Sequence, residues 1–556
     1  MIRKDELMST KQNFQRARIT NENKLFSPLR SIVETAFYGN NVVEINDLQT
    51  AYDMACQSPG TVITDLDVYK PEHLGLKEGA KVLLFNGGSV TGRAAAARRI
   101  IGNEGVDESD LNKKVMDAIY ATRKMKLYHA QTVIGLQEDF MVHAHLLIPE
   151  GEENLLYNWM LNFQPLTEKY QEMYKRSQHL PETDIYVFSF PEWTHPDHPL
   201  GLTYFDTQHN CAALLGMEYF GEHKKGTLTL AWAIADRNGY ASCHGGAKTI
   251  YSGSHPPYTL AVFGLSGSGK STLTHAQHDG KYKIRILHDD AYIINVKEKY
   301  AIALEPTYFD KLQDYPTNHP ANKYLLTMQN VGITLDARGN KVPVTQDIRN
   351  GNGRAIKSRL WSPNRVDRLD DPITAIAWIQ KDPVLPPILR IKDPVMGSLM
   401  GATLSTKRTS AERLAKGIDP NQLVIEPYAN PFRTYPLSND FEKFLELIKD
   451  GVTCYVLNTG YFQDRKIPKE MTIHIIETLV EEKDQWKPWV IEGMDYMPIE
   501  KFEPDVKDAN YQADVRESFS KRLQFINDLS AYNQLPPIAS EKLKEIVDAL
   551  KWQRFH

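Results

Sequence analysis

The sequence is poor in cysteine and contains no long apolar run. Four cysteines occur among 556 residues, and none forms a Cys-x-x-Cys pair. This scarcity argues against a disulfide framework and against a thiolate zinc site, and it favours a reducing compartment. The polar N-terminal segment lacks the apolar stretch of a signal peptide, and no run of about 18 apolar residues predicts a membrane span. We therefore expect a cytoplasmic protein.

Net charge is also low. The formal charge of −5 leaves no strong basic field that would favour nucleic acid, although a local basic cluster can still bind phosphate. His195 and His198 in THPDHP resemble metal ligands, but the prolines and the lack of a later partner carboxylate favour a plain loop. We expect neither nucleic acid nor a membrane as partner, and nothing in the sequence indicates an oligomeric state.

Length and local pattern predict two α/β domains. A chain of 556 residues is too long for one ordinary core. Strand-like runs such as KVLLF and TLAVFGL alternate with helical patterns in both halves, including helices near 468–482, 511–531 and 540–552. The Pro-, Gly- and Ser-rich run SGSHPPYT supplies a boundary. We expect an N-terminal substrate-side domain at 1–252 and a C-terminal nucleotide-binding domain at 253–556.

The strongest local signal is GLSGSGKST, which matches the phosphate-binding loop template. Its glycines let backbone N–H groups turn toward phosphate oxygens, Lys270 adds positive charge, and Ser271 offers a hydroxyl to Mg²⁺. The apolar run LAVF precedes the loop and a helical pattern follows it, as the template requires. The expected nucleotide-binding residues of the loop are Gly264, Leu265, Ser266, Gly267, Ser268, Gly269, Lys270, Ser271 and Thr272.

Two further patterns point to a metal. The run KIRILHDDAYIIN places Asp289 and Asp290 at the end of an apolar strand, where carboxylates suit one or two metal ions; a helix-capping pair is the alternative. EYFGEHKKG alone favours a solvated turn. Together, however, Lys225, His244 and Asp290 form a nitrogen and oxygen set that suits Mn²⁺ better than Ca²⁺. Lysine binds metal only when neutral, and the ammonium of Lys224 beside it favours that form.

In this order, EYFGEHKKG, His244, GLSGSGKST and the Asp-Asp strand end resemble the phosphoenolpyruvate carboxykinase family, and most of all its ATP-dependent branch. Weaker matches are Thr91-Gly92-Arg93, LEPTYFDK, NGNGRAI, KDPVLPPILR and VLNTGY, so the resemblance covers residues from about 80 to about 500. It implies a two-domain α/β architecture in which a mixed sheet of the C-terminal domain carries the phosphate-binding loop.

The resemblance implies a reaction in which oxaloacetate loses CO₂ and the enolate takes the γ-phosphoryl group of ATP, giving phosphoenolpyruvate and ADP. The cofactors implied are ATP, Mn²⁺ and Mg²⁺, and the partners are the nucleotide and the small-molecule substrate. The implied catalytic residues are Arg93, Tyr219, Lys224, Lys225, Ser266, Lys270 and Arg354. The implied metal-binding residues are Lys225, His244, Ser271, Asp289 and Asp290, and the further nucleotide-binding residues are Glu305, Lys311 and Arg413.

The sequence also departs from the family pattern. RAAAAR replaces the family's Arg-Ser-Pro-Lys-Asp, LEPTYFDK lacks its glycines and cysteine, and Tyr428 replaces a threonine near the expected adenine pocket. These departures motivate two alternatives: a diverged phosphotransferase acting on another carboxylate or on a protein hydroxyl, and a non-catalytic nucleotide-binding protein. The Gly-, Ser- and Thr-rich segment 397–417 is predicted to be a lid that excludes water, with a plain surface loop as the alternative.

Overall fold

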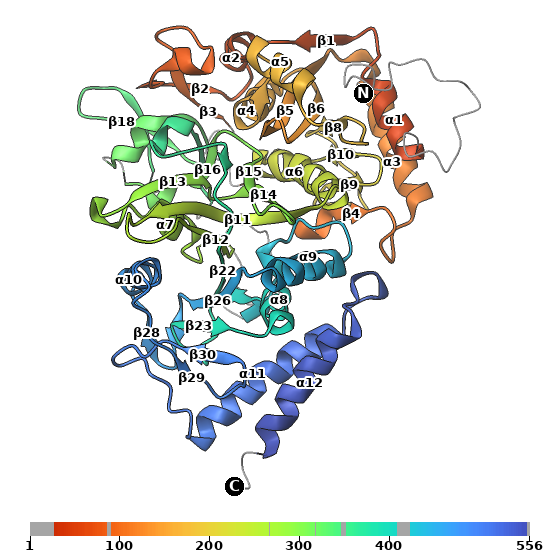
Figure 1. Ribbon diagram of the computed structural model, residues 1–556. Helices are drawn as coiled ribbons and strands as arrows, with labels where there is room; N and C mark the ends of the chain where they lie inside the picture. The colour runs from red at the N-terminus through yellow and green to blue at the C-terminus, as the bar shows by residue number, and fades with distance from the viewer. Residues whose placement is uncertain are drawn as a thin grey trace. The chain divides into compact units, whose positions relative to one another are not determined.

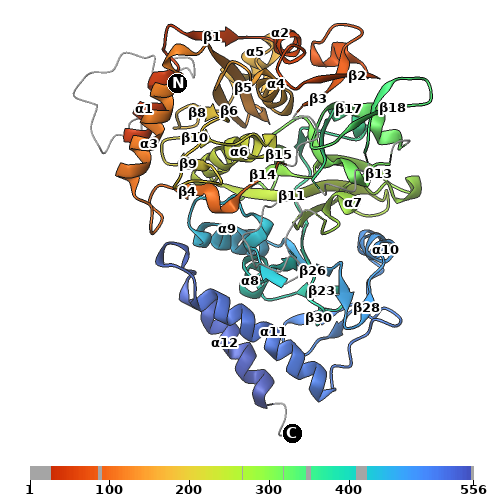
Figure 2. The same ribbon diagram turned by 180° about the vertical axis from the view of Figure 1, so that it is seen from behind.

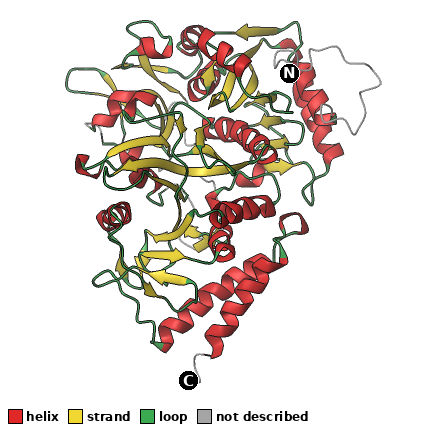
Figure 3. Ribbon diagram, in the orientation of Figure 1, coloured by secondary structure: helices red, strands yellow, loops and turns green. Residues whose placement is uncertain are grey.

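The protein forms two compact units whose chain segments alternate (Figure 1). The computed structural model describes residues 27–85, 91–265, 267–316, 319–345, 352–407 and 423–552. Among these, unit 1 is built from 27–234 and 304–363, and unit 2 from 235–303, 364–407 and 423–552. Strands and helices mix in both units (Figure 3), which confirms the α/β class.

The division into units differs from the predicted boundary at residues 252 and 253. Strands β11 (Tyr240–Tyr251) and β12 (Tyr258–Phe263) pair antiparallel, so SGSHPPYT is the turn of a hairpin inside unit 2. In addition, residues 304–363 belong to unit 1 because three of their strands complete a sheet with two strands from the first hundred residues. A Pro- and Gly-rich run marks a turn equally well in either setting.

Unit 1 contains an eight-stranded sheet whose order is β1-β5-β6-β8-β10-β9-β4, with β7 paired to β5. Its strands are β1 (Val42–Ile45), β4 (Arg98–Ile100), β5 (Leu127–Gln137), β6 (Phe140–Pro149), β7 (Gln164–Pro165), β8 (Ile185–Phe190), β9 (Leu202–Asp206) and β10 (Cys211–Leu215). Helices α1 (Pro28–Ala36) and α3 (Glu108–Ala121) cover one face through a shared apolar cluster. Helix α6 (Phe220–Arg237) packs on the other face, where Gly226 approaches Leu214 and Phe205.

A second, five-stranded sheet completes unit 1, in the order β16-β20-β17-β3-β2. Its strands are β2 (Val62–Asp67), β3 (Lys81–Phe85), β16 (Tyr308–Lys311), β17 (Leu325–Gln329) and β20 (Arg354–Lys357). The hairpin β18 (Ile333–Leu335) and β19 (Lys341–Pro343) and the helices α2 (Leu48–Ala55), α4 (Glu153–Asn162) and α5 (Glu168–Arg176) also belong to unit 1. Helix α4 is buried on every side and contacts both α2 and β20.

Unit 2 is built on an eleven-stranded mixed sheet, in the order β21-β15-β14-β11-β12-β22-β26-β23-β30-β29, with β13 paired to β11. Its further strands are β13 (Lys283–His288), β14 (Ala291–Asn295), β15 (Ala301–Ala303), β21 (Arg368–Leu369), β22 (Ala375–Gln380), β23 (Ile388–Ile391), β26 (Thr453–Asn458), β29 (Lys487–Pro488) and β30 (Met494–Tyr496). Strands β12, β22 and β26 are parallel to one another. Two small hairpins, β24 (Ser405–Lys407) with β25 (Leu423–Ile425) and β27 (Tyr461–Phe462) with β28 (Arg465–Lys466), complete the strands.

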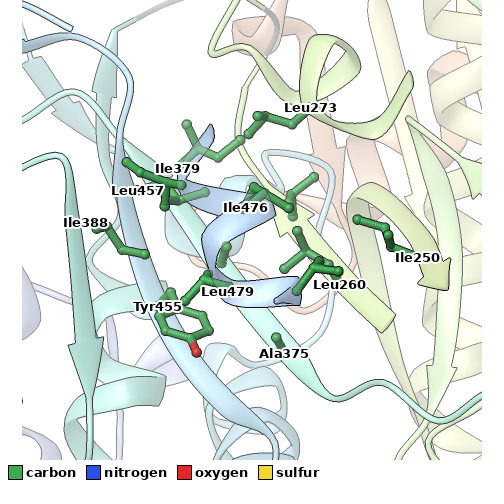
Figure 4. Packing of buried hydrophobic residues seen from close by; sticks show 14 of the residues in the cluster. Ile250, Leu260, Leu273, Ala375, Ile379, Ile388, Tyr455, Leu457, Ile476 and Leu479 are labelled. Atoms are coloured by element: carbon green, nitrogen blue, oxygen red, sulfur yellow. The ribbon is translucent and has the colours of Figure 1, made fainter. Parts of the chain in front are cut away.

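The central strands of unit 2 are buried on both faces. Strand alternation points Ala375, Ala377 and Ile379 of β22 toward α10 (Lys469–Val480), where Ile476 and Leu479 meet them (Figure 4). Trp378 points to the other face and packs against Phe444 of α9 (Leu437–Lys449). A sheet covered on both faces explains why its strands are continuous apolar runs rather than alternating ones.

The helices predicted near the C-terminal end are confirmed as α10, α11 (Ala509–Asn527) and α12 (Pro537–Trp552). Helices α11 and α12 lie side by side in both views (Figures 1 and 2). Within the described ranges, no helix combines the length and the apolar character needed to span a membrane.

Helix α8 (Pro394–Ala402) corrects the first half of the predicted lid. Gly397 and Gly401 lie in this buried helix, so the glycine content of the segment permits close packing rather than motion. A Cβ on Gly401 would lie 2.6 Å from a ring atom of Tyr428 and 2.8 Å from one of Trp378. The next strand, β24, ends at Lys407, and the remainder of the predicted lid lies outside the described residues.

This packing gives a stability prediction for Gly401→Ala. Overpacking costs about 1–3 kcal/mol, which outweighs the gain of about 1 kcal/mol expected when alanine replaces glycine in a helix. We therefore expect a lower midpoint of urea unfolding. Gly397→Ala is the matched control, because its new Cβ meets first the mobile Cδ1 atom of Ile448, and we expect little loss there. Equal losses in the two variants would contradict the packing argument.

Candidate active site

The phosphate-loop sequence joins β12 to helix α7 (Lys270–His275), so strand, loop and helix follow the predicted order. Gly267 and Gly269 adopt φ angles of +78° and +97°, which favour glycine. Lys381, just after β22, donates from Nζ to the carbonyl oxygen of Gly267 at 2.9 Å. Thr459, just after β26, donates from Oγ1 to the carbonyl oxygen of Ser268 at 2.7 Å. The residues that follow β22, the parallel neighbour of β12, and β26, the next strand of the sheet, therefore fix the loop.

Three of the predicted site residues come together beside this loop. Asp290 Oδ1 lies 3.0 Å from His244 Nε2 and 3.8 Å from Lys270 Nζ. His244 Nδ1 is hydrogen-bonded to the carbonyl oxygen of Ala429, which can only accept, so Nδ1 carries the hydrogen. In a neutral ring, Nε2 then presents a lone pair to the Asp290 carboxylate. Two such acceptors 3.0 Å apart require a shared cation, either a proton or a metal ion.

Asp289 differs from its neighbour in partner and in burial. Both aspartates lie in the turn between β13 and β14, as the sequence predicts for a strand end. Asp289 Oδ2 lies 3.5 Å from His275 Nε2, at the end of α7. Burial by itself would raise the pKa of Asp289, but the hydrogen bond from His275 and the charges of His275, His288 and Lys270 lower it well below the usual range. Asp289 is therefore ionised and paired inside unit 2.

In unit 1, the Lys-Lys run lies in the first turns of α6 and not in a solvated turn. His223 is fully buried, its Nε2 lies 2.7 Å from Ser189 Oγ, and burial lowers the pKa of His223 to about 4. The segment GTLTLAWAIA continues this buried helix. The Lys-Lys run is thus part of the core, and Gly226 allows the helix to approach Leu214 and Phe205 of the sheet.

The two lysines have different surroundings. Lys224 has no solvent exposure, and its Nζ lies 2.9 Å from Oε1 of the equally buried Glu305. Asn162 Nδ2 donates to the second carboxylate oxygen of Glu305 at 2.7 Å. Lys225 is only partly buried, and its Nζ lies 5.4 Å from the ring centre of Trp232. Successive residues of a helix point about 100° apart, so the two amines extend from the helix in different directions.

Arg354 lies at the centre of a second cationic group in unit 1. Its Nε donates to Tyr219 Oη at 3.3 Å. In the register of β16 and β20, Arg354 is directly opposite Lys311, and in that of β17 and β20 it is opposite Gln329. Like charges directly opposite one another destabilise a strand pair. This placement therefore favours an anion near Arg354 and Lys311.

Two buried asparagines, which no local sequence pattern indicates, hold the Thr91-Gly92-Arg93 segment. Thr91 donates from its backbone N–H and from Oγ1 to Asn330 Oδ1, at 3.2 and 2.8 Å. Asn330 Nδ2 and Asn352 Nδ2 both donate to the Thr91 carbonyl oxygen at 2.7 Å. Asn330 has a φ angle of +60°, a conformation that asparagine tolerates better than most residues. These contacts connect the segment to the strand that begins at Arg354.

A buried ion pair that the sequence did not predict lies next to Arg93. Arg98 Nε lies 3.4 Å from Glu222 Oε1. Burial raises the pKa of Glu222, although the positive charges of Arg98 and Arg93 oppose this. Burial also lowers the pKa of Arg98 to about 10. The second arginine of RAAAAR therefore has a partner on α6, which the spacing in the sequence does not indicate.

The remaining predictions concern the adenine region and the lid. Ser266 and Arg413 lie outside the described residues. Tyr428, which replaces a threonine of the family pattern, is buried, stacks on Phe444 at 4.8 Å between ring centres, and is hydrogen-bonded to Ser398. Its ring is part of the core of unit 2, so this substitution affects packing and does not present a side chain to a base.

Comparison with known proteins agrees with these motifs. A family model described as phosphoenolpyruvate carboxykinase matches residues 72–487. A protein of Aeropyrum pernix named phosphoenolpyruvate carboxykinase (ATP) is 29% identical over 290 residues, which cover 50% of this chain and 58% of that relative. A glycosomal protein of Trypanosoma brucei brucei with the same enzyme name is 43% identical over 61 residues, 11% of this chain and 12% of the relative. The family match spans well over half of the sequence, and this chain belongs to the phosphoenolpyruvate carboxykinase family.

Proposed function

We propose that this protein decarboxylates oxaloacetate and transfers the γ-phosphoryl group of ATP to the resulting enolate, giving phosphoenolpyruvate, CO₂ and ADP. The observation that carries the proposal is the group formed by His244, Asp290 and Lys270 beside a phosphate-loop sequence, in a chain of this family. The preference for ATP rests on the names of the two relatives. The matched region covers just over half of the first relative, so the complete activity is part of the proposal.

Nucleotide binding is assigned to unit 2. The positive φ angles of Gly267 and Gly269, and the hydrogen bonds that hold the carbonyl groups of Gly267 and Ser268, support phosphate binding by the segment from Gly264 to Thr272. Ser271 follows Lys270 in α7 and supplies a hydroxyl for Mg²⁺. For Glu305, the buried contact with Lys224 supports a positioning role rather than direct contact with the nucleotide.

The residues of unit 2 fit a divalent metal ion. His244 offers Nε2 and Asp290 offers Oδ1, an imidazole and carboxylate pair that suits Mn²⁺. The family resemblance adds Lys225 as a third ligand, an assignment that rests on the sequence alone. A bound Mn²⁺ ion would stabilise the negative charge that decarboxylation leaves on the enolate oxygen. Asp289, held by His275, supports the turn that carries Asp290.

The protein's own side chains orient the substrate and neutralise charge. Arg93 is proposed to bind a substrate carboxylate, in a segment held by Asn330 and Asn352. Tyr219 presents its hydroxyl group to the same substrate, and Arg354 fixes that group by donating to it. The cations of Lys224, Lys270 and Arg354 neutralise the phosphoryl group as it moves, which is the main contribution a protein makes to such a transfer.

One coupled assay tests the proposal. Purified protein receives phosphoenolpyruvate, bicarbonate, ADP and Mn²⁺, and oxaloacetate is followed through NADH oxidation by malate dehydrogenase. We expect NADH oxidation that requires all four components. ATP binding without any oxaloacetate formation would refute the carboxykinase and leave the diverged phosphotransferase and the non-catalytic nucleotide-binding protein.

That second candidate is motivated by LEPTYFDK, which lacks the family's glycines and cysteine. It would transfer the phosphoryl group to another carboxylate or to a protein hydroxyl without losing CO₂. Incubation with γ-labelled ATP separates the two candidates, because a carboxykinase labels phosphoenolpyruvate only when oxaloacetate is present. Label on another acid or on protein would favour the diverged enzyme.

Lys225→Gln tests the assignment of the neutral amine. We expect activation by Mn²⁺ to disappear and kcat to fall about 10²-fold, because a metal ligand is lost, while ATP affinity stays within twofold. Lys521→Gln, which removes an exposed lysine of α11, is the matched control and should leave both quantities unchanged. A Mn²⁺ activation curve identical to that of the unaltered protein would refute the role of Lys225.

A further inference from the structure

A group of metal-ligating side chains lies buried in unit 1, apart from the residues assigned above. His143 and His145 are two residues apart on β6, so both point to the same face of the sheet. Asp184 directly precedes β8, the parallel neighbour of β6, in which Tyr186 is opposite His145. Among the described residues, only these three His, Cys, Asp or Glu side chains bring their ligand atoms within 4.8 Å of one another.

The distances in this group match a coordination sphere. Asp184 Oδ2 lies 3.1 Å from His145 Nε2 and 3.4 Å from His143 Nδ1. Nitrogen and oxygen ligands bound tetrahedrally at 2.0–2.1 Å lie about 3.3 Å from one another. The two measured separations lie on either side of this value. The two distances therefore fit two edges of a tetrahedron of ligand atoms around one ion.

The hydrogen-bond chain behind His145 indicates where a lone pair must lie. His129 Nδ1 is 2.8 Å from Glu44 Oε1, and a carboxylate can only accept, so this nitrogen carries a hydrogen. In a neutral His129 ring, Nε2 then accepts from His145 Nδ1, at 2.9 Å. In a neutral His145 ring, Nε2 is left as an acceptor that faces the Asp184 carboxylate. Metal-bound histidines have this arrangement, with the outer N–H donated to a second group.

His143 gives a second, independent indication of a ligand. Its side chain is 5% exposed, and its Nε2 finds no hydrogen-bond partner among the described residues. Buried polar groups are nearly always satisfied, so an orphaned imidazole nitrogen requires an explanation. The rings of Tyr174 and Tyr186 pack against the two histidines.

We propose that His143, His145 and Asp184 bind one Zn²⁺ ion, which joins β6 to the start of β8. Two imidazoles and one carboxylate suit zinc, whereas Ca²⁺ and Mg²⁺ require mainly oxygen ligands. Three protein ligands leave the fourth position to water, and the buried surroundings between two strands assign the ion a structural role in unit 1. None of the three residues is among the proposed Mn²⁺ ligands, so the two ions can be tested independently.

Zinc content is measured in the full chain carrying Asp290→Asn, which removes the proposed catalytic ligand. After treatment with a chelator and reloading with Zn²⁺, we expect one zinc per chain by elemental mass spectrometry, and a melting temperature several degrees higher than that of the stripped protein. Adding Asp184→Asn or His143→Gln should abolish both effects. The double variant His195→Gln/His198→Gln removes two histidines from the loop between β8 and β9 and should retain the zinc.

A cobalt experiment keeps the proposal testable if the added variants fail to fold. Co²⁺ loaded into the Asp290→Asn protein should give the intense visible absorption of a four-coordinate ion, and Zn²⁺ should displace it. Less than one zinc per chain together with no such absorption would overturn the proposal, and a proton would then be the only cation shared by His145 and Asp184.

Discussion

Asp290→Asn is expected to remove carboxykinase activity and tight Mn²⁺ binding together. Asparagine keeps the shape of the side chain but removes the charge that faces His244 Nε2 at 3.0 Å. A catalytic metal contributes several kcal/mol to transition-state stabilisation, and each 1.4 kcal/mol is a factor of ten in rate. We therefore expect kcat/KM to fall about 10³-fold. Free Mn²⁺, measured by electron paramagnetic resonance during a titration, should show that a tight site is lost.

Asp289→Asn is the matched control, because it makes the same chemical change one residue earlier. Asp289 contacts His275 instead of His244, and its carboxylate is more deeply buried. We expect a lower melting temperature, since the ionised group loses its pairing with His275, but retained Mn²⁺ binding. Loss of Mn²⁺ binding in Asp289→Asn, with retention in Asp290→Asn, would reverse the assignment of the two aspartates.

The sequence predicts the parts of the site whose geometry is local. The phosphate-loop sequence could be placed between β12 and α7, because glycine spacing and apolar runs are properties of neighbouring residues. The aspartates at the end of β13 could be placed for the same reason. The helical nature of the Lys-Lys segment could not, since its internal glycines lower helix propensity and only packing on the sheet stabilises it.

Long-range pairing explains most of what the sequence did not predict. The predicted boundary divided β11 from β12, because a turn within a hairpin and a linker between domains have the same composition. The partnership of Thr91 with Asn330 joins residues 239 positions apart, and no local pattern encodes it. His143 and His145 lie in an apolar strand, and no local pattern links them to Asp184, which precedes a different strand.

The buried pair of Lys224 and Glu305 gives the largest expected effect on stability. Lys224→Met leaves the Glu305 carboxylate in the core of unit 1 with Asn162 as its hydrogen-bond donor. Removing one partner of a buried ion pair costs about 3–5 kcal/mol, because the other charge loses its compensation. We expect the free energy of unfolding, measured by urea denaturation, to fall by this amount.

The double variant Lys224→Met/Glu305→Gln separates stability from function. Replacing both charges with uncharged groups of similar size is often neutral for stability, so most of the lost free energy should return. Activity should not return, because the cation proposed to face the phosphoryl group is still missing; loss of one such donor lowers kcat about 10²–10³-fold. If the double variant instead regained full activity, Lys224 would serve only to hold α6 against Glu305, and Lys270 and Arg354 would have to neutralise the phosphoryl group without it.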